Sequence, residues 1–413
     1  MFSDDLINFV KTLRQMQLPN LSTKNYIIEH QHDNLKELLL KKRHIDDVDY
    51  EFAYRQIAGR QRIKHKLPEF YNNVDIIYPH QINLEQSSSE STALYKKTIC
   101  EGSIYIDITG GFGIDFYYIS ECFKEAIYVE RNQDLFEIVT HNLKVTGREN
   151  TKTICDDALN FIPNMPVSDF VMVDPARRDN SGGKVVLLSD CEPDITQIYK
   201  AILNKTNALL VKLSPMLDIS AALNELSGVC EVHVVSVENE CKEILLLLKN
   251  ENQSITKYFA VNILKNNTTE KFVFTKEEES DAKSILCENV LTYLYEPNSS
   301  VLKAGAFKCV SQHFGIEKLQ INTHLYTSDN LISNFPGRRF KVLKLWPGNK
   351  SSMKEMGKKL VKANISSRNH PLKPDEIKKK TGIADGGDTY LFACSLKNEV
   401  KVYIECEKIT SEA

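Results

Sequence analysis

The sequence predicts an α/β protein whose central part is a doubly wound parallel sheet. Strand-sized apolar runs alternate with helix-sized amphipathic segments between residues 104 and 248. Such alternation is typical of a parallel sheet that is covered by helices on both faces. A mostly helical segment precedes this region, and shorter strand and helix patterns follow it. The 413 residues are enough for two to four domains at roughly 150 residues each.

The central region contains seven predicted strands, at 104–108, 126–130, 151–154, 169–173, 208–213, 232–237 and 244–248. Four helices are predicted between them, at 114–122, 133–145, 195–203 and 219–226. Only residues 238–243 separate the last two strands, and these are too few for a crossover helix. The final pair is therefore predicted to be an antiparallel hairpin.

Smaller modules flank this sheet. Apolar residues at 6, 9, 10 and 13, and again at 35, 38 and 39, have helical spacing. After residue 250 we predict strands 258–264 and 272–275, helices 280–293 and 301–314, a helix from Pro374 to near Gly382, and a hairpin of strands 389–394 and 400–405. The predicted domains are a helical module at 1–75, the α/β domain at 76–254, and α+β modules at 255–335 and 336–413.

Composition excludes several protein classes. Hydrophobic residues make up 42% and charged residues 26% of the chain, as in ordinary folded proteins. The longest aliphatic run, 244–248, is far shorter than the ~20 residues of a membrane span. The first residues lack a secretory signal pattern, so we expect a cytoplasmic protein. The ten cysteines show no CxxC or zinc-finger spacing, which predicts reduced thiols and no metal site.

Positive charge is concentrated near the C-terminus. Residues 338–380 contain 14 Lys and Arg against three acids, a net charge of +11, so the rest of the chain carries −14 within the total of −3. Such segregation indicates a surface that faces a polyanion. A solvated lysine-rich surface without a partner would give the same pattern.

The strongest motif follows the first strand, where Asp107 precedes a turn that contains Gly110, Gly111 and Gly113. Glycines let a backbone turn approach a ligand closely. A dinucleotide fingerprint requires Gly-x-Gly-x-x-Gly, but counted from Gly111 the third position is Phe116. An acid before the turn disfavours a pyrophosphate and suits a cation, such as the sulfonium or amino group of S-adenosylmethionine. The alternative is a strand-to-helix turn with incidental glycines.

Acidic residues end the next three strands. Glu130 is placed to accept hydrogen bonds from ribose hydroxyls, although an acid at a strand end is often surface decoration. After the third strand, Asp157 or its neighbour Asp156 can accept from an adenine amino group. The fourth strand leads into Asp174, which should emerge beside the reactive end of the ligand because ligands bind at the carboxyl ends of parallel strands.

With these motifs, the chain resembles bacterial class I S-adenosylmethionine-dependent methyltransferases that carry a C-terminal THUMP-like domain. The matching segments are 84–93, 107–115, 174–178, 212–215, 295–298, 335–338 and 385–387, together with Glu130 and Asp157. The resemblance implies a Rossmann-like class I methyltransferase sheet ending in the hairpin, S-adenosylmethionine as the cofactor, a ferredoxin-like module at 255–335 and a basic THUMP-like module after it.

The site residues follow from the motifs and the resemblance. The predicted catalytic residues are Asp174, Pro175 and Arg177. The predicted cofactor-binding residues are Gln86, Ser88, Thr92, Asp107, Thr109, Gly110, Gly111, Gly113, Asp115, Glu130 and Asp157. The predicted substrate-binding residues are Arg178, Lys212, Arg338 and Arg339.

Some of these assignments have structural alternatives. The hydroxyls of 86–92 suit a helix N-cap that faces the cofactor carboxylate, or a serine-rich linker. Arg177 and Arg178 could contact substrate or form ordinary loop salt bridges. Lys212 could bind an anionic substrate or bury its stem beneath a surface ammonium.

Amino-methylating enzymes on nucleic acids typically present Asn/Asp-Pro-Pro-aromatic, whereas this chain has Ala176 and Arg177 after Asp174 and Pro175. Asp174 can still accept a hydrogen bond from a nucleophile and orient it. The expected activity is in-line methyl transfer to an RNA base, in tRNA or rRNA. A small-molecule or protein methyltransferase, and a non-catalytic RNA-binding protein that retains the fold, are the alternatives.

Overall fold

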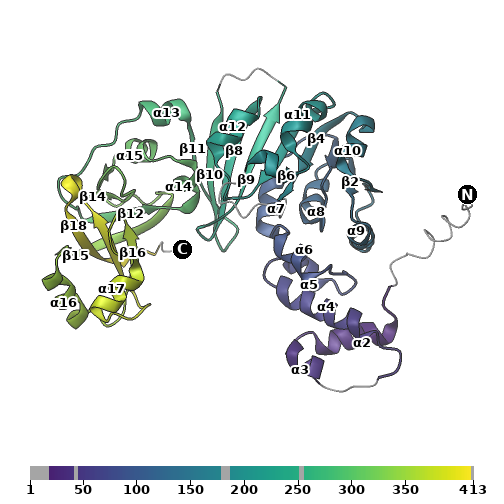
Figure 1. The fold of residues 1–413 in the computed structure, drawn as a ribbon, viewed down its shortest axis with the longest axis horizontal. Helices are drawn as coiled ribbons and strands as arrows, with labels where there is room; N and C mark the ends of the chain where they lie inside the picture. Colours follow the sequence, from purple (N-terminus) through teal and green to yellow (C-terminus); the bar gives the residue numbers. More distant parts are fainter. Residues whose placement is uncertain (1–17, 41–44, 178–186, 251–254, 411–413) are drawn as a thin grey trace, which may run out of the picture. The chain divides into compact units, whose positions relative to one another are not determined.

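The computed structural model describes residues 18–40, 45–177, 187–250 and 255–410 (Figure 1). The chain divides into two compact units. The first comprises Met1–Val229 and Leu246–Asn252, and the second comprises Cys230–Leu245 and Gln253–Ala413. Each unit is described by itself below.

Helices form the beginning of the first unit, as predicted. They are α2 (Leu21–His30), α3 (Leu35–Leu40), α4 (Tyr50–Ile63), α5 (Pro68–Asn72), α6 (Gln81–Gln86) and α7 (Glu90–Lys97). The Asp49 carboxylate starts α4 by accepting from the backbone N–H of Phe52 at 3.0 Å. Phe52, Ile57 and Ile63 of this helix are buried. The predicted apolar stripe at 6–13 lies outside the described residues.

A nine-stranded sheet has the order β11-β10-β8-β9-β7-β4-β1-β2-β3. Its strands are β1 (Ile104–Asp107), β2 (Glu125–Glu130), β3 (Thr151–Cys155), β4 (Ser168–Val173), β7 (Thr206–Leu213), β8 (Val229–Val237), β9 (Glu240–Lys249), β10 (Lys257–Ile263) and β11 (Thr269–Thr275). The intervening helices include α8 (Ile114–Ser120), α9 (Gln133–Val145), α10 (Ala158–Phe161), α11 (Ile195–Leu203) and α12 (Ile219–Glu225). All seven strands and four helices predicted for the central region form, with small shifts at their ends.

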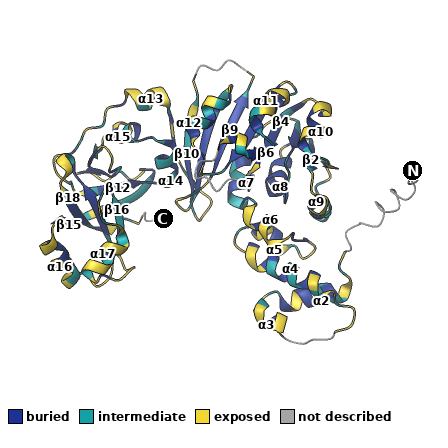
Figure 2. Ribbon diagram, in the orientation of Figure 1, coloured by how far each residue is buried: buried dark blue, intermediate teal, exposed yellow. Residues whose placement is uncertain are grey.

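The strand order fixes where a ligand can bind. From β1 the chain runs outward through β2 and β3 and then returns to β4, on the other side of β1. These four strands and β7 are parallel, so their carboxyl ends meet at one edge, and the reversal between β1 and β4 opens a crevice there. Figure 2 shows the inner strands of this sheet as largely buried, whereas the edge strand β3 contains no buried residue.

The predicted hairpin of the last two central strands also forms. Only Glu238 and Asn239 separate β8 from β9, and both have positive φ, 48° and 69°. Two such residues make the tight turn that matches the twist of an antiparallel pair.

The next two strands, which belong to the second compact unit, extend this sheet. β10 pairs parallel with β8, and β11 pairs antiparallel with β10. This differs from the expectation that residues 255–275 belong to a ferredoxin-like module. The apolar run of β10, in which Tyr258 and Val261 are buried, covers the edge that β8 would otherwise expose.

A seven-stranded sheet forms most of the second unit, in the order β13-β14-β12-β15-β18-β17-β16. Its strands are β12 (Tyr293–Pro297), β13 (Glu317–Lys318), β14 (Tyr326–Ser328), β15 (Gly337–Pro347), β16 (Asn364–Arg368), β17 (Thr389–Ser395) and β18 (Lys401–Lys408). The helices of this unit are α13 (Lys276–Asp281), α14 (Ser299–Ala304), α15 (Lys308–Phe314), α16 (Lys350–Lys359) and α17 (Pro374–Thr381). The predicted C-terminal helix and hairpin are confirmed as α17 and as β17 with β18.

Two helix predictions in this unit are wrong. The helix expected at 280–293 does not form, because Cys287 donates its N–H to the Lys318 carbonyl and Lys318 donates to the Ile285 carbonyl. These long-range bonds hold the segment extended, and only α13 precedes it. The helix expected at 301–314 is divided into α14 and α15 at Gly305, whose φ of 79° ends α14.

No helix among the described ranges combines the length and apolar character that crossing a membrane requires. None of the ten cysteines, all of which lie in the described ranges, forms a disulfide, and seven of them are buried.

Candidate functional site

The turn between β1 and α8 requires glycine for steric reasons. Gly110 donates its N–H to the Val129 carbonyl at 2.9 Å, which holds the turn against β2. A Cβ atom on Gly110 would lie 2.0 Å from the Tyr128 ring. Gly111 and Gly113 have φ values of 54° and 74°, a region that side chains disfavour. The predicted turn is therefore a tight, preformed loop at the carboxyl end of β1.

Glu130 ends β2 beside this turn. Its carboxylate oxygens accept the N–H of Gly111 at 2.8 Å and the N–H of Asn132 at 2.7 Å. Each carboxylate oxygen can accept a further hydrogen bond. The backbone thus fixes the Glu130 carboxylate in a position where a ligand with two neighbouring hydroxyl groups can donate to it.

A pocket of about 300 Å³ lies at the carboxyl ends of the parallel strands. Of the predicted site residues, it is lined by Thr109, Glu130, Asp157 and Asp174, and Asp156 lines it as well. The structure therefore brings residues from four different strand ends to one cavity.

Sequence reasoning missed other residues of this lining, including Asn83, Arg131, Leu135 and Glu192. Arg131 Nη1 lies 2.6 Å from Glu192 Oε1 and 3.7 Å from Asp157 Oδ2. The sequence feature that could have indicated Arg131 as a pocket residue is its position directly after Glu130. No sequence pattern relates Arg131 to Glu192, which is 61 positions away.

Both candidate adenine contacts lie at this pocket, and each also stabilises its own loop. Asp157 caps α10 by accepting from the N–H of Leu159 at 2.9 Å. Asp156 Oδ1 accepts from the N–H of Asp157 at 2.8 Å. The choice between the two carboxylates stays open.

Asp174 is held at the pocket by two interactions. Its backbone N–H donates to Thr109 Oγ1 at 2.6 Å, which connects the loops after β4 and β1. Its side-chain Oδ2 pairs with Lys212 Nζ at 2.5 Å. The Asp174 side chain is 40% exposed, so part of it faces the cavity.

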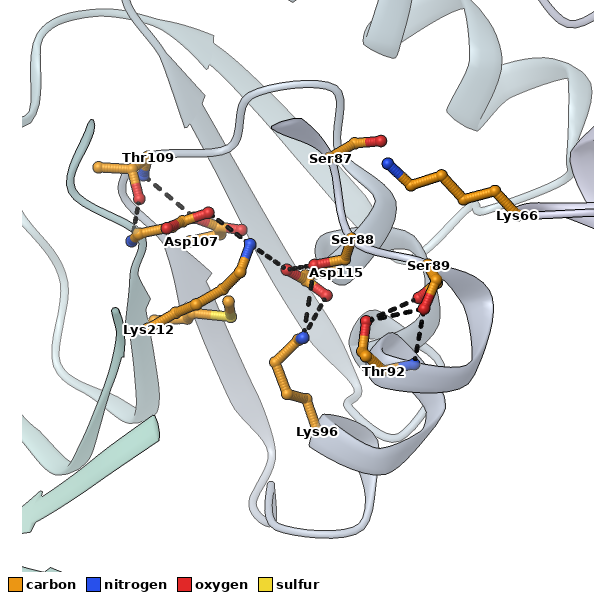
Figure 3. A network of polar contacts seen from close by, with 12 residues as sticks. Lys66, Ser87, Ser88, Ser89, Thr92, Lys96, Asp107, Thr109, Asp115 and Lys212 are labelled. Atoms are coloured by element: carbon orange, nitrogen blue, oxygen red, sulfur yellow. Dashed lines mark hydrogen bonds and ion pairs between the residues drawn. The ribbon is translucent and has the colours of Figure 1, made fainter. Parts of the chain in front are cut away.

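Lys212 connects the partly exposed Asp174 to what we call the buried charge network, which consists of Lys96, Asp115 and Lys212 (Figure 3). Asp115 lies 3.1 Å from Lys96 Nζ and 3.4 Å from Lys212 Nζ, and Ser88 Oγ donates to Asp115 Oδ2 at 2.7 Å. The Lys96 side chain is 0% exposed.

The network keeps Asp115 ionised. Burial by itself would raise the pKa of Asp115, but the ammonium groups of Lys96 and Lys212 and the Ser88 hydroxyl lower it overall. The network thus joins α7, α8 and the end of β7 beneath the pocket.

Asp107 lies next to the network, where burial outweighs the effect of the nearby Lys212 ammonium on its pKa. Its Oδ1 accepts from the N–H of Thr109 at 3.0 Å, and the residue is 3% exposed. Burial raises the pKa of Asp107 to about 8, although the Thr109 N–H opposes this, and the nearby Asp115 and Asp174 carboxylates raise it further. Asp107 therefore holds a proton below pH 8, and a cationic ligand beside it would favour loss of that proton.

Several predicted residues do not line the pocket. Ser88 and Asp115 belong to the polar contacts beneath it, and the Thr92 hydroxyl donates to the Ser89 carbonyl at 3.0 Å. Ser89 caps α7, so a helix N-cap forms in the 86–92 segment as expected. The cofactor contacts predicted for Gln86, Ser88 and Thr92 stay predictions.

The remaining predicted residues fall elsewhere. Pro175 directly follows Asp174, and Arg177 lies on β5 (Ala176–Arg177), which pairs antiparallel with β6 (Cys191–Glu192). Arg178 lies outside the described residues. Arg338 and Arg339 lie on β15 in the second compact unit.

Comparison with known proteins assigns the C-terminal part of the chain. Residues 293–336 match a ferredoxin-like domain family, and residues 337–408 match a THUMP domain-like family. No curated protein matches the chain.

One solved structure is similar over nearly the whole chain. It is described as a "putative methyltransferase" from Porphyromonas gingivalis W83, and it has 32% sequence identity and a TM-score of 0.86. The match covers 94% of this chain and 98% of that one. The chain belongs to this methyltransferase family. The Rossmann-like sheet and the C-terminal THUMP-like domain are therefore family features.

Other solved structures match only part of this chain. An rRNA methylase from Streptococcus thermophilus has 16% identity and a TM-score of 0.28, and it covers 38% of this chain and 92% of its own. A precorrin-6y C5,15-methyltransferase from Geobacter metallireducens GS-15 has 17% identity and a TM-score of 0.30. It covers 45% of this chain and 95% of its own. These similarities are too low to bear on the substrate.

Proposed function

We propose that the protein transfers a methyl group from S-adenosylmethionine to an RNA base. The observation that carries this proposal is the acidic pocket at the carboxyl ends of the parallel strands, which is lined by Glu130, Asp156, Asp157 and Asp174. The buried Asp107 does not line it but ends β1 two residues before Thr109, which does. When bound, S-adenosylmethionine supplies an electrophilic methyl group and two positively charged groups.

The residues present fit that cofactor. Asp107 would face one of its cationic groups, and the backbone-fixed carboxylate of Glu130 would accept from the ribose hydroxyls. Asp157 or Asp156 would accept from the adenine amino group. The glycine turn would let the backbone approach the cofactor at Gly111, where an added Cβ would have only the Thr109 carbonyl oxygen within 4 Å, whereas the absent side chain of Gly110 makes room for the Tyr128 ring.

Asp174 is the proposed hydrogen-bond acceptor for the methyl-accepting group. Lys212 holds its Oδ2, and no residue in the described part of the chain donates to Oδ1, which would accept from the substrate. An ionised carboxylate only accepts hydrogen bonds, so this arrangement favours a nucleophile that carries a proton, such as an amine. Holding the nucleophile in line can supply roughly 7 to 11 kcal/mol of a transfer barrier. Little acid–base chemistry is then required of the protein.

The RNA assignment is supported by the second unit. The basic segment 338–380 falls within the match to the THUMP domain-like family at 337–408. Lysines and arginines that contact phosphates provide affinity that is largely independent of sequence. A small-molecule or protein substrate would not require this concentration of positive charge.

The first experiment measures cofactor binding by titration calorimetry with S-adenosylmethionine and S-adenosylhomocysteine. The second compares, by mass spectrometry, the nucleosides of tRNA and rRNA from a strain that lacks the gene with those of its parent. Binding together with the loss of one methylated nucleoside is the expected result. Binding without any change in RNA would indicate a small-molecule or protein substrate, and no binding would contradict the proposal.

A further inference from the structure

Two arginines of the second unit share one buried carboxylate. Glu296 of β12 is 2% exposed at its side chain. Its Oε2 accepts from Nε of Arg338 at 2.7 Å and also from Nη2 of Arg338, and its Oε1 accepts from Nη2 of Arg368 at 2.9 Å. One negative charge therefore holds two guanidinium groups, which leaves this cluster with a net positive charge.

The two arginines come from distant strands of one sheet. Arg338 lies on β15, directly beside Glu296, whereas Arg368 ends β16. Three strands, β15, β18 and β17, separate β12 from β16 in the sheet order. At roughly 4.8 Å between neighbouring strands, a flat sheet would place β16 about 19 Å from β12. The sheet must curl for Arg368 to reach Glu296, and the shared carboxylate then fixes both guanidinium groups.

Each guanidinium retains donors for another ligand. Nη1 of Arg338, and Nε and Nη1 of Arg368, have no acceptor among the residues that the structure describes. The side chains of Arg338 and Arg368 are 31% and 42% exposed, so these donors are accessible to solvent. Arg338 also lies over the rings of Phe340 and Tyr390, at 5.6 and 5.8 Å from their centres.

A further basic residue, Lys318, lies near the cluster of Glu296, Arg338 and Arg368. Burial, with the charges of Lys318 and Arg368, lowers the pKa of the nearby His324 to about 4. Lys318 Nζ donates to the Ile321 carbonyl at 2.7 Å, and no carboxylate forms an ion pair with it among the described residues. Glu296 thus pairs with Arg338 and Arg368, whereas the carboxylate whose charge acts on Lys318 is that of Glu279.

We infer that Arg338 and Arg368, positioned by Glu296, form a binding site for a backbone phosphate of RNA. Guanidinium groups present parallel N–H donors that match phosphate oxygens. A prepositioned pair loses less side-chain entropy on binding than two free arginines would. The inference rests on the proposed RNA substrate and adds the residues, two from the basic segment and one from β12, that would fix the register of the RNA.

The test measures binding of bulk tRNA at several salt concentrations, without cofactor. Arg368→Ala should weaken binding and reduce the slope of log K against log salt by about one, because one phosphate contact is lost. Arg368→Lys should retain the slope, since it retains the charge. The control is Lys397→Ala, which removes one positive charge from an exposed ion pair with Glu288 in the same unit and should leave the slope unchanged.

A second measurement avoids variants that fail to fold. An arginine-specific reagent is applied to the wild-type protein with and without tRNA, and the modified peptides are identified by mass spectrometry. Protection of Arg338 and Arg368 by tRNA is expected. Equal modification with and without bound tRNA would overturn the inference.

The outcomes separate this inference from the proposed function. If the wild-type protein binds tRNA but Arg368→Ala behaves like Lys397→Ala, the phosphate site is wrong and the RNA substrate stands. If the wild-type protein binds no RNA, both the site and the RNA substrate are wrong. Calorimetry with S-adenosylmethionine tests the methyltransferase assignment independently.

Discussion

Asp107 determines how the proposed site should respond to pH. Its pKa of about 8 means that the ligand-free protein holds a proton on this carboxyl group below pH 8. A cationic ligand favours the carboxylate and releases that proton. The affinity for S-adenosylmethionine should therefore increase with pH, by up to about tenfold per unit below 8, and level off above it.

Calorimetry in buffers of different ionisation enthalpy would detect the released proton directly. Asp107→Asn should weaken binding and remove this pH dependence, because the amide cannot ionise. An affinity that is constant between pH 6 and 9 in the wild-type protein would contradict the proposed contact between Asp107 and a cation.

Asp174 and Lys212 should affect the transfer step more than cofactor binding. Asp174→Asn keeps the size of the side chain but removes the charge that pairs with Lys212 at 2.5 Å. Single-turnover rates should fall by about 10²-fold or more, as expected when a reacting group is mispositioned, while the Kd for S-adenosylhomocysteine changes little. Loss of cofactor binding in Asp174→Asn would instead indicate a structural role.

At the scale of elements, the buried charge network should stabilise the packing of α7 on α8. Lys96→Met leaves Asp115 with one ammonium partner fewer in a buried environment. Removing one partner of a buried ion pair costs about 3 to 5 kcal/mol, and urea unfolding would measure this loss. The neighbouring Lys97→Met is a matched control, because Lys97 forms a partly exposed pair with Glu121 and should change stability by at most about 1 kcal/mol.

The glycine turn permits a second test at this scale. In Gly110→Ala the added Cβ would meet the Tyr128 ring at 2.0 Å, so β1 and β2 would have to separate at the pocket. Cofactor binding should be lost, and unfolding should become easier by about 1 to 3 kcal/mol. Gly147→Ala is the control for cofactor affinity alone, because no atom lies within 4 Å of its added Cβ and the residue does not line the pocket, but its φ of 71° makes any side chain there cost stability. Equal cofactor affinities in the two variants would contradict a steric role for Gly110.

The central elements could be predicted from sequence because their signals are local. The apolar run of β4 and the helical periodicity of α9 each lie within one short, continuous stretch of sequence. The segment 280–293 has a helical pattern too, but its backbone groups are taken by the Lys318 region, more than thirty residues later. Such pairing depends on tertiary structure, which local propensity does not contain.

The same contrast between local sequence signals and tertiary contacts applies to the residues of the pocket. Glu130, Asp157 and Asp174 could be predicted because each ends a recognisable strand. The partners that set their chemistry could not: Lys212 is 38 positions from Asp174, and Lys96 precedes Asp115 on a different helix. Sequence reasoning left Lys212 either to an anionic substrate or to a buried stem beneath a surface ammonium, and the structure gives this ammonium two carboxylate neighbours, Asp115 and Asp174.

At the scale of the whole molecule, opposite charges are separated along the chain. The acidic pocket belongs to the first unit, and the basic segment 338–380 belongs to the second. This division suits a protein that holds a cationic cofactor with one unit and a polyanionic substrate with the other. Binding of RNA and binding of cofactor should then respond differently to salt.

The affinity for tRNA should fall steeply with salt, whereas the affinity for S-adenosylhomocysteine should change little, because only RNA binding releases many counterions. Lys379 and Lys380 of α17 are exposed and lie in the basic segment. Replacing both with Gln should reduce the salt slope for tRNA by up to about two. Replacing the exposed Lys152 and Lys265, which lie outside the segment, should leave it unchanged. Equal losses in the two double variants would mean that net charge alone attracts RNA and that the basic segment forms no docking surface.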